Sequence, residues 1–306
     1  MLRVREDTVP ADVECELAVP AGYHLGRSLS GLRMGSGDPC MALEAGRVRW
    51  ALYTPAGPAT LEAVQGAGGL RLRAWGDGAA WLGEHAAGPL GLLDPAEEFA
   101  PESEPVGRLW RRFRGTRLPR LPVVLPRAVQ VVLLQLVTTQ DGHGSWRRLV
   151  RGLGEAAPGP FDLLLPPSAA RLRTTAEYVF PSFGVLPRQA RTVLRLAREA
   201  PWLERAAAEG PEALRRRLET IPGVGEWTIQ YVLGSALADT DAVLVGDYNL
   251  PHAVGFVLAG EERASEERML ELLEPYRGHR YRVIRLLWMN GVHAPRRGPR
   301  MPRRVL

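Results

Sequence analysis

The spacing of apolar positions changes about one third of the way along the chain. Up to residue 76, short segments rich in β-formers alternate apolar and polar side chains, and Gly- and Pro-containing turns separate them. This pattern is typical of antiparallel hairpins. The clearest strands are expected at 47–54, 59–64 and 69–76. Residues 79–93 then take a helical period and 94–105 form an acidic, proline-rich connector, so a domain boundary is expected near residue 100.

Beyond residue 106 the apolar positions recur at helical spacing. The helices expected there are 126–139, 145–154, 168–175, 186–200, 211–221, 226–238, 250–259, 266–276 and 280–290. The pattern predicts an α+β fold, with an antiparallel β-rich N-terminal domain (1–100) followed by a helical region (101–294). An Arg/Pro-rich tail (295–306) ends the chain.

Composition and charge narrow the function. The two cysteines, Cys15 and Cys40, provide neither a disulfide framework nor an iron–sulfur cluster, which needs four. No apolar run is long enough to span a bilayer, and a reducing cytoplasm is the expected compartment. Residues 1–100 are net acidic, whereas residues 101–306 carry 31 arginines against 21 acidic residues. A basic region of this kind attracts polyanions, although a solubilising role would produce the same excess.

The chain contains no lysine, so all 39 basic residues are arginines. A lysine nucleophile that forms a Schiff base with its substrate is therefore absent.

A glycine-rich turn interrupts two helical segments at Pro222-Gly223-Val224-Gly225. Glycines beside a helix start leave backbone N–H groups open to an anion such as a phosphate. A tight connection between two helices with no ligand would have the same sequence.

Aromatic and acidic residues follow this turn. Trp227 and Tyr231 are four residues apart, so their rings share one face of the second helix, either as core residues or as the wall of a pocket. Asp247 comes after an apolar run, 242–245, and just before a helix. It could cap that helix, and the same carboxylate could also stabilise a nearby cation or orient a water molecule.

The motif Leu218-x-x-Ile221-Pro-Gly-Val-Gly-x-Trp-Thr, with Asp247 twenty residues after Trp227, resembles the helix-hairpin-helix/Gly-Pro-Asp superfamily of DNA glycosylases. Within it, the chain is similar to the 3-methyladenine-DNA glycosylase II family. The resemblance implies a helix-hairpin-helix glycosylase domain with an active-site cleft between 101 and 294.

The resemblance also implies residue roles. Asp247 matches the catalytic carboxylate. The residues matching the base pocket are Trp227, Tyr231, Tyr276 and Tyr178. DNA contacts are implied for Pro222, Gly223, Val224, Gly225, Thr228, Gln135 and Leu136. Leu136 matches the wedge that replaces an extruded base, although it could equally be a core leucine. A monovalent cation on the hairpin carbonyls is a further implication.

The activity implied is that of a monofunctional glycosylase in base excision repair, without lyase activity or a cofactor. It would release N3- or N7-methylated purines from double-stranded DNA and leave an abasic site. Two alternatives are a glycosylase for an oxidised or deaminated base, and a damaged-DNA-binding protein without turnover. The protein is expected to act as a monomer, to avoid membranes and to associate with the nucleoid.

Overall fold

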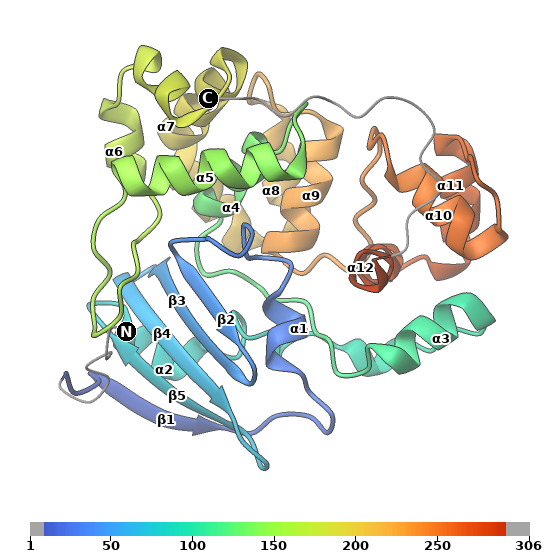
Figure 1. Ribbon diagram of the computed structural model, residues 1–306, viewed down its shortest axis with the longest axis horizontal. Helices are drawn as coiled ribbons and strands as arrows, with labels where there is room; N and C mark the ends of the chain where they lie inside the picture. The colour runs from blue at the N-terminus through green and yellow to red at the C-terminus, as the bar shows by residue number, and fades with distance from the viewer. Residues whose placement is uncertain (1–8, 292–306) are drawn as a thin grey trace.

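The computed structural model describes residues 9–291, so the predicted tail at 295–306 lies outside the described residues. Its N-terminal part is an antiparallel sheet with strand order β1-β5-β4-β3-β2 (Figure 1). The strands are β1 (Val13–Leu17), β2 (Met41–Glu44), β3 (Arg47–Thr54), β4 (Gly57–Gln65) and β5 (Leu70–Trp75). The α+β fold class and the N-terminal antiparallel sheet are therefore confirmed.

Both faces of the sheet are covered. On one face, inward side chains such as Leu61 and Leu72 are completely buried in a core that also contains Leu25, Leu29 and Leu82. The last three come from helices α1 (Leu25–Leu29) and α2 (Ala79–His85).

On the opposite face, a loop from the helical region packs against the strands (Figure 1). Leu163 and Leu165 of this loop pack on Ala51 of β3, and the Phe161 ring lies 5.1 Å from that of Trp75. The sheet is thus attached firmly to the helices.

The helices form two cores. The larger core contains buried side chains from α4 through α9, with Trp146 and Phe180 among its largest members. Its elements are α4 (Leu125–Leu133), α5 (Thr139–Leu153), α6 (Ala169–Thr174), the 3₁₀ helix η2 (Glu177–Phe183), α7 (Pro187–Glu209), α8 (Pro211–Glu219) and α9 (Glu226–Ala236).

The smaller helical core joins segments from both sides of the larger one in sequence. It contains α3 (Glu104–Arg112), α10 (Leu250–Ala259), α11 (Glu266–Leu273), the 3₁₀ helix η3 (Glu274–Tyr276) and α12 (Arg280–Asn290). A buried ion pair connects the N-terminal and C-terminal segments of this core. Arg282 of α12 donates to both oxygens of Asp94, at 2.8 and 2.6 Å, and Asp94 lies beside the 3₁₀ helix η1 (Ala96–Glu98).

This arrangement adds detail to the predicted domain division. Residues 99–118 pack with the C-terminal helices, so the region predicted as 101–294 contains two cores that meet along α9. Trp227 and Tyr231 of α9 pack against both. Within residues 9–291, no helix has the length and apolar character needed to cross a bilayer.

One expected helix ends earlier than its pattern predicts. Helix α4 ends at Leu133 within the expected span 126–139, and α5, expected at 145–154, already begins at Thr139. Thr138 caps α5, because its hydroxyl accepts a hydrogen bond from Asp141 N at 3.1 Å. The turn between them contains Gln135 and Leu136.

Candidate active site

The hairpin between α8 and α9 has a backbone that only glycine suits at one position. Gly223 has φ +96°, and a Cβ there would lie 2.1 Å from the Thr192 hydroxyl oxygen. Gly225 begins α9 with open space around it, and no side chain caps this helix. The N–H groups of the first turn of α9 therefore point from an uncovered surface, as phosphate recognition requires.

Two side chains from outside the hairpin form hydrogen bonds with it. Gln135 donates its amide to the Gly223 carbonyl at 3.1 Å and to the Thr228 hydroxyl at 2.8 Å. Arg195 donates to the Pro222 carbonyl at 2.9 Å. The side chains of Gln135 and Thr228, both predicted to contact DNA, thus bind each other and the hairpin, and Thr228 is buried.

The predicted monovalent cation would need free lone pairs on the carbonyl groups of the hairpin. The Ile221 carbonyl accepts from Val224 N, while those of Pro222 and Gly223 accept from side chains. Each of these carbonyl oxygens has a second lone pair, so it could bind a cation in addition to the hydrogen bond that it already accepts. Among residues 9–291, no three His, Cys, Asp or Glu side chains are grouped to hold a metal ion. Cys15 and Cys40 are free thiols.

Leu136 lies on the surface, so it is not a core leucine. Its side chain is 70% exposed, and its φ of +56° is in the left-handed region that branched residues rarely adopt. An exposed apolar residue held in a strained turn is a candidate functional feature. The Gln135 contacts tie this turn to the hairpin.

Asp247 accepts three hydrogen bonds at the start of α10. Oδ1 accepts from Asn249 N at 2.8 Å and Leu250 N at 2.9 Å, which is a capping arrangement. Oδ2 accepts from the indole Nε1–H of Trp227 at 2.9 Å. The N-cap residue itself is Asn249, so Asp247 binds the N–H groups at the helix start from two residues before the cap. Asp247 is only partly buried, which leaves its carboxylate room for a second role.

The rings beside Asp247 come from two helices. Trp227 and Tyr231 meet edge to face, with centroids 5.4 Å apart, and Trp288 of α12 lies 5.6 Å from Tyr231. Trp227 presents its N–H edge to the carboxylate. Sequence reasoning missed Trp288, although its spacing of seven residues from Tyr281 places the two on one side of a helix.

The other two predicted pocket residues lie differently. Tyr276 is only 8% exposed in the smaller helical core, and its hydroxyl is hydrogen bonded to Ser103. This burial leaves the ring little surface for a base. Tyr178 is 84% exposed on η2. Neither has the contacts with Asp247 or Tyr231 that Trp227 has.

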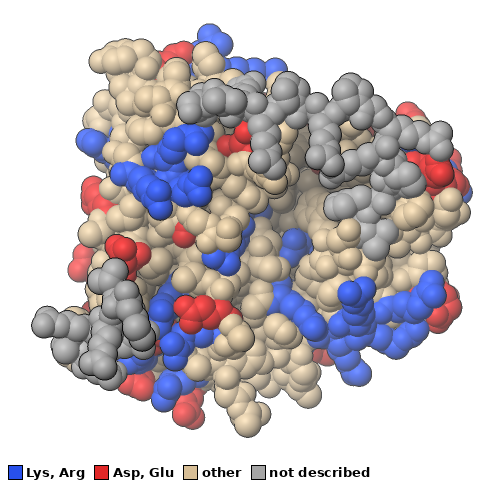
Figure 2. Space-filling model, viewed as in Figure 1, with Lys and Arg blue, Asp and Glu red and all other residues tan. Residues whose placement is uncertain are grey.

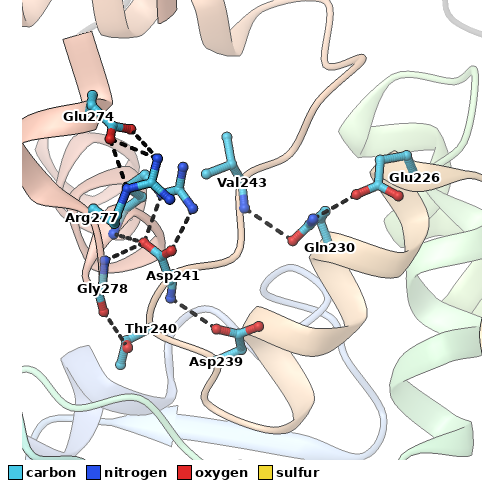
Figure 3. A network of polar contacts seen from close by, with 10 residues as sticks. Glu226, Gln230, Asp239, Thr240, Asp241, Val243, Glu274, Arg277 and Gly278 are labelled. Atoms are coloured by element: carbon cyan, nitrogen blue, oxygen red, sulfur yellow. Dashed lines mark hydrogen bonds and ion pairs between the residues drawn. The ribbon is translucent and has the colours of Figure 1, made fainter. Parts of the chain in front are cut away.

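The segment that carries Asp247 is fixed by a polar network (Figure 3). Asp241 accepts from Arg280 Nε at 2.8 Å and from Gly278 N at 2.7 Å, and the Thr240 hydroxyl donates to the Gly278 carbonyl. On the other side, Gln230 of α9 accepts from Val243 N at 3.2 Å. The segment is thereby held between α9 and α12.

The network also sets the charge of Asp241. Partial burial acts to raise its pKa, but hydrogen bonds from the Arg280 guanidinium and from Arg280 and Gly278 N–H outweigh it and hold the pKa below its usual value of 3.8. The carboxylate form that binds Arg280 is therefore the stable form.

One face of the molecule is concave and flanked by positive charge (Figure 2). Figure 2 shows it hollowed between the α5–α9 group and the α10–α12 group. Arginines gather in the same view over α3 and α12 and over α5 and α6. The exposed arginines on α3, α5 and α6 are Arg108, Arg111, Arg112, Arg147, Arg151, Arg171 and Arg173.

Comparison with known proteins gives a consistent result. No protein-family model matches the chain. It is 24% identical over 188 residues to DNA-3-methyladenine glycosylase 2 of Escherichia coli, an alignment that spans 61% of this chain and 64% of that protein. The chain thus aligns with slightly less than two thirds of that relative's length.

Solved structures share the fold over almost the whole chain. A 3-methyladenine DNA glycosylase from Archaeoglobus fulgidus superposes with a TM-score of 0.78 at 18% identity, covering 90% of this chain and 97% of that one. An 8-oxoguanine glycosylase/lyase from Clostridium acetobutylicum, in complex with double-stranded DNA, gives 0.71 at 10% identity, with coverage of 93% and 100%. The chain therefore has the fold of these DNA glycosylase structures, and about three fifths of it is similar in sequence to DNA-3-methyladenine glycosylase 2.

Proposed function

We propose that the protein is a monofunctional DNA glycosylase that releases N3- and N7-methylated purines from double-stranded DNA and leaves an abasic site. The observation that carries the proposal is the Asp247 carboxylate, held by Trp227 and by the start of α10 beside aromatic rings and close in the chain to the hairpin. Base excision repair, with the nucleoid as the place of action, is the corresponding cellular role.

Binding would begin with the DNA backbone. The first turn of α9 offers N–H groups to a phosphate, and the exposed arginines add a salt-dependent attraction. Leu136 would enter the duplex and fill the space left by the extruded nucleotide. Flipping costs a few kcal/mol and is easiest at a damaged pair.

Cleavage of the glycosidic bond would follow at Asp247. The bond's electron pair leaves with the base, so the sugar gains oxocarbenium character near C1′. A carboxylate stabilises that developing positive charge electrostatically. A water molecule then adds to C1′ and gives up a proton, which completes hydrolysis. A methylated purine carries a positive charge before cleavage and departs as a neutral molecule, so its barrier is comparatively low.

Absence of lyase activity is proposed from the missing nucleophile. The chain contains no lysine that could attack C1′ and form a Schiff base. The DNA strand should therefore remain intact after base release.

The test is incubation of the purified protein with duplex DNA that contains a single 7-methylguanine or 3-methyladenine. Free methylated base, detected by chromatography, is expected together with strand nicks that appear only after alkali treatment. If no base were released, the proposed activity would be wrong. Nicks that formed before alkali treatment would contradict the monofunctional assignment alone.

A further inference from the structure

A buried guanidinium group lies behind one of the rings beside Asp247. Arg127 of α4 is only 2% exposed, and its guanidinium carbon stands 5.1 Å from the centroid of the Tyr231 ring. An arginine in this position attracts the negative face of the ring. The face of Tyr231 nearest Arg127 is therefore already engaged by a cation.

All hydrogen-bond partners of Arg127 are uncharged. Nε donates to the Ser235 hydroxyl at 2.8 Å, while the terminal nitrogens donate to Gln130 Oε1 at 3.0 Å and to the Gly31 carbonyl at 3.1 Å. Across residues 9–291 it forms no ion pair. Asp38 and Arg127 both line one small cavity. The Asp38 carboxylate, however, accepts hydrogen bonds from Met34 N, Cys40 N and the Trp146 indole, and not from Arg127. The charge of Arg127 is thus solvated by neutral groups and is not neutralised by a carboxylate.

A second guanidinium reinforces the first. Arg285 of α12 lies 6.0 Å from the Trp288 ring centroid, and Trp288 is the ring next to Tyr231. This guanidinium packs flat on Gly31, where a Cβ would be 2.5 Å from its carbon atom. Gly31 of the N-terminal domain therefore contacts Arg127 through its carbonyl and Arg285 through its bare Cα.

A positive charge behind an aromatic wall changes which bases that wall favours. Rings without such backing attract a cationic base. A base packed on Tyr231 would lie about one ring thickness farther from Arg127 than Tyr231 does, where two like charges still repel at the low effective dielectric of a partly buried site. The backing thus offsets part of the attraction that Tyr231 would offer to a methylated, positively charged purine.

The same charge assists a neutral base as it leaves. An uncharged purine departs with the electron pair of the glycosidic bond and gains negative charge, which a nearby guanidinium stabilises. A cationic purine departs neutral and gains nothing from that stabilisation. Both effects lower the excision rate of cationic purines relative to that of neutral purines.

We propose that Arg127, supported by Arg285, is a positioning residue that widens the substrate range of the pocket toward uncharged modified purines by opposing selection for cationic ones. The inference rests on the proposed glycosylase function and adds to it the substrate class. Arg127 acts through Tyr231 and through its electric field, without touching the substrate.

The test compares single-turnover excision of 7-methylguanine, which is cationic, with excision of hypoxanthine, which is neutral. The measured quantity is the ratio of the two rate constants in each variant. In Arg127→Gln the ratio of cationic to neutral excision should rise about tenfold, because a full charge near the pocket is lost. In Arg127→Lys the charge is kept, and the ratio should stay within about twofold of the parent.

Further variants separate charge from folding. Arg285→Gln removes a half-exposed group and should raise the ratio by a smaller factor, which keeps the proposal testable if Arg127→Gln fails to fold. Arg205→Gln is the matched control, because Arg205 stacks on Trp202 on α7, 4.6 Å from the ring centroid, outside the proposed site. Its ratio should equal the parent's.

Two results would overturn the proposal: an unchanged ratio in both Gln variants, or an equal shift in Arg127→Lys and Arg127→Gln, which would indicate shape and not charge. Failure of the parent protein to release either base is distinct from these results and would contradict the proposed function itself.

Discussion

The hairpin and the segment carrying Asp247 lie before and after the same helix, α9, yet they are built by different means. The conformation of the hairpin is set mainly by its own backbone, the left-handed Gly223 and the uncapped start of α9, and the distant Gln135 and Arg195 bind its carbonyl groups. The Asp247 segment depends on side chains distant in sequence, such as Arg280, which binds Asp241 from 39 residues away. A local structure can be read from a short motif, whereas a structure held by distant side chains cannot.

The two regions also divide the proposed work. The hairpin would grip a phosphate, and the Asp247 segment would act on the sugar. If this division is correct, substitutions in one region should affect binding and those in the other should affect excision.

The largest expected effect is on excision in Asp247→Asn. Asparagine keeps the shape and an oxygen that can accept from Trp227 or Leu250 N, but it loses the negative charge. Excision of 7-methylguanine should fall by about a thousandfold, the scale of losing one electrostatic stabiliser. DNA affinity, measured by fluorescence anisotropy, should change by less than about threefold. A variant that excised at the parental rate would remove Asp247 from the mechanism.

The next effect should be seen in Gly223→Ala. A Cβ here would collide with the Thr192 hydroxyl, and φ of +96° is unfavourable for alanine. DNA affinity should fall by about tenfold or more as the hairpin distorts, a cost of ~1.4 kcal/mol. Gly26→Ala in α1 is the control, because Gly26 lies outside the hairpin, a Cβ there would have its nearest neighbour at 3.8 Å, and its helical backbone suits alanine. Equal losses in both variants would mean that hairpin shape is not what binds DNA.

Substitution of Leu136 in the exposed turn should have a smaller effect. In Leu136→Gly the excision rate should decrease while the stability of the fold increases. Leu136→Gly removes the wedge and relieves a φ of +56°, so excision should fall severalfold while the free energy of unfolding rises by about 1 kcal/mol. Leu136→Ala removes the wedge but keeps the backbone strain, so only excision should fall. Chemical denaturation measures the difference. Equal stability in the two variants would show that the turn is unstrained.

The smallest effect is expected at Asp241. Asp241→Asn breaks the ion pair with Arg280 and should lower the free energy of unfolding by about 1 kcal/mol at neutral pH. The folded-state pKa of Asp241 lies below 3.8, so its stabilising contribution is present above about pH 4 and disappears as pH falls through the lower folded-state pKa. The stabilities of parent and variant should therefore converge in acid. A difference that persisted at low pH would assign the effect to something other than this charge.

The sequence predicted those parts of the site that depend on neighbouring residues and not those held by distant side chains. The hairpin, the helical α9 and the position of Asp247 before α10 were recognisable because each depends on neighbours in the chain. For Leu136 the apolar pattern predicted a position inside a helix, and only the resemblance implied an exposed wedge, because the break between α4 and α5 depends on the Thr138 cap and on Gln135 reaching the hairpin.

The aromatic surroundings were predicted only in part for the same reason. Trp227 and Tyr231 are neighbours as their spacing predicted, but Trp288 reaches Tyr231 only because α12 packs beside α9. Tyr276 is buried in the smaller helical core, and its hydroxyl is hydrogen bonded to Ser103, a residue of the stretch 94–105 that was expected to be only a connector. Arg127 lies 104 residues from Tyr231, and nothing local in the sequence joins them.

The most direct test of Asp247 as the group that stabilises positive charge on the sugar is a binding measurement with two abasic-site analogues. One duplex carries a protonated pyrrolidine at the abasic position, which mimics the charged sugar, and the other carries a neutral tetrahydrofuran. The parent should bind the charged analogue at least about tenfold more tightly, Asp247→Asn should bind the two equally, and Gly223→Ala should weaken both by the same factor. If Asp247→Asn still preferred the charged analogue as strongly as the parent does, the proposed role of Asp247 would be contradicted.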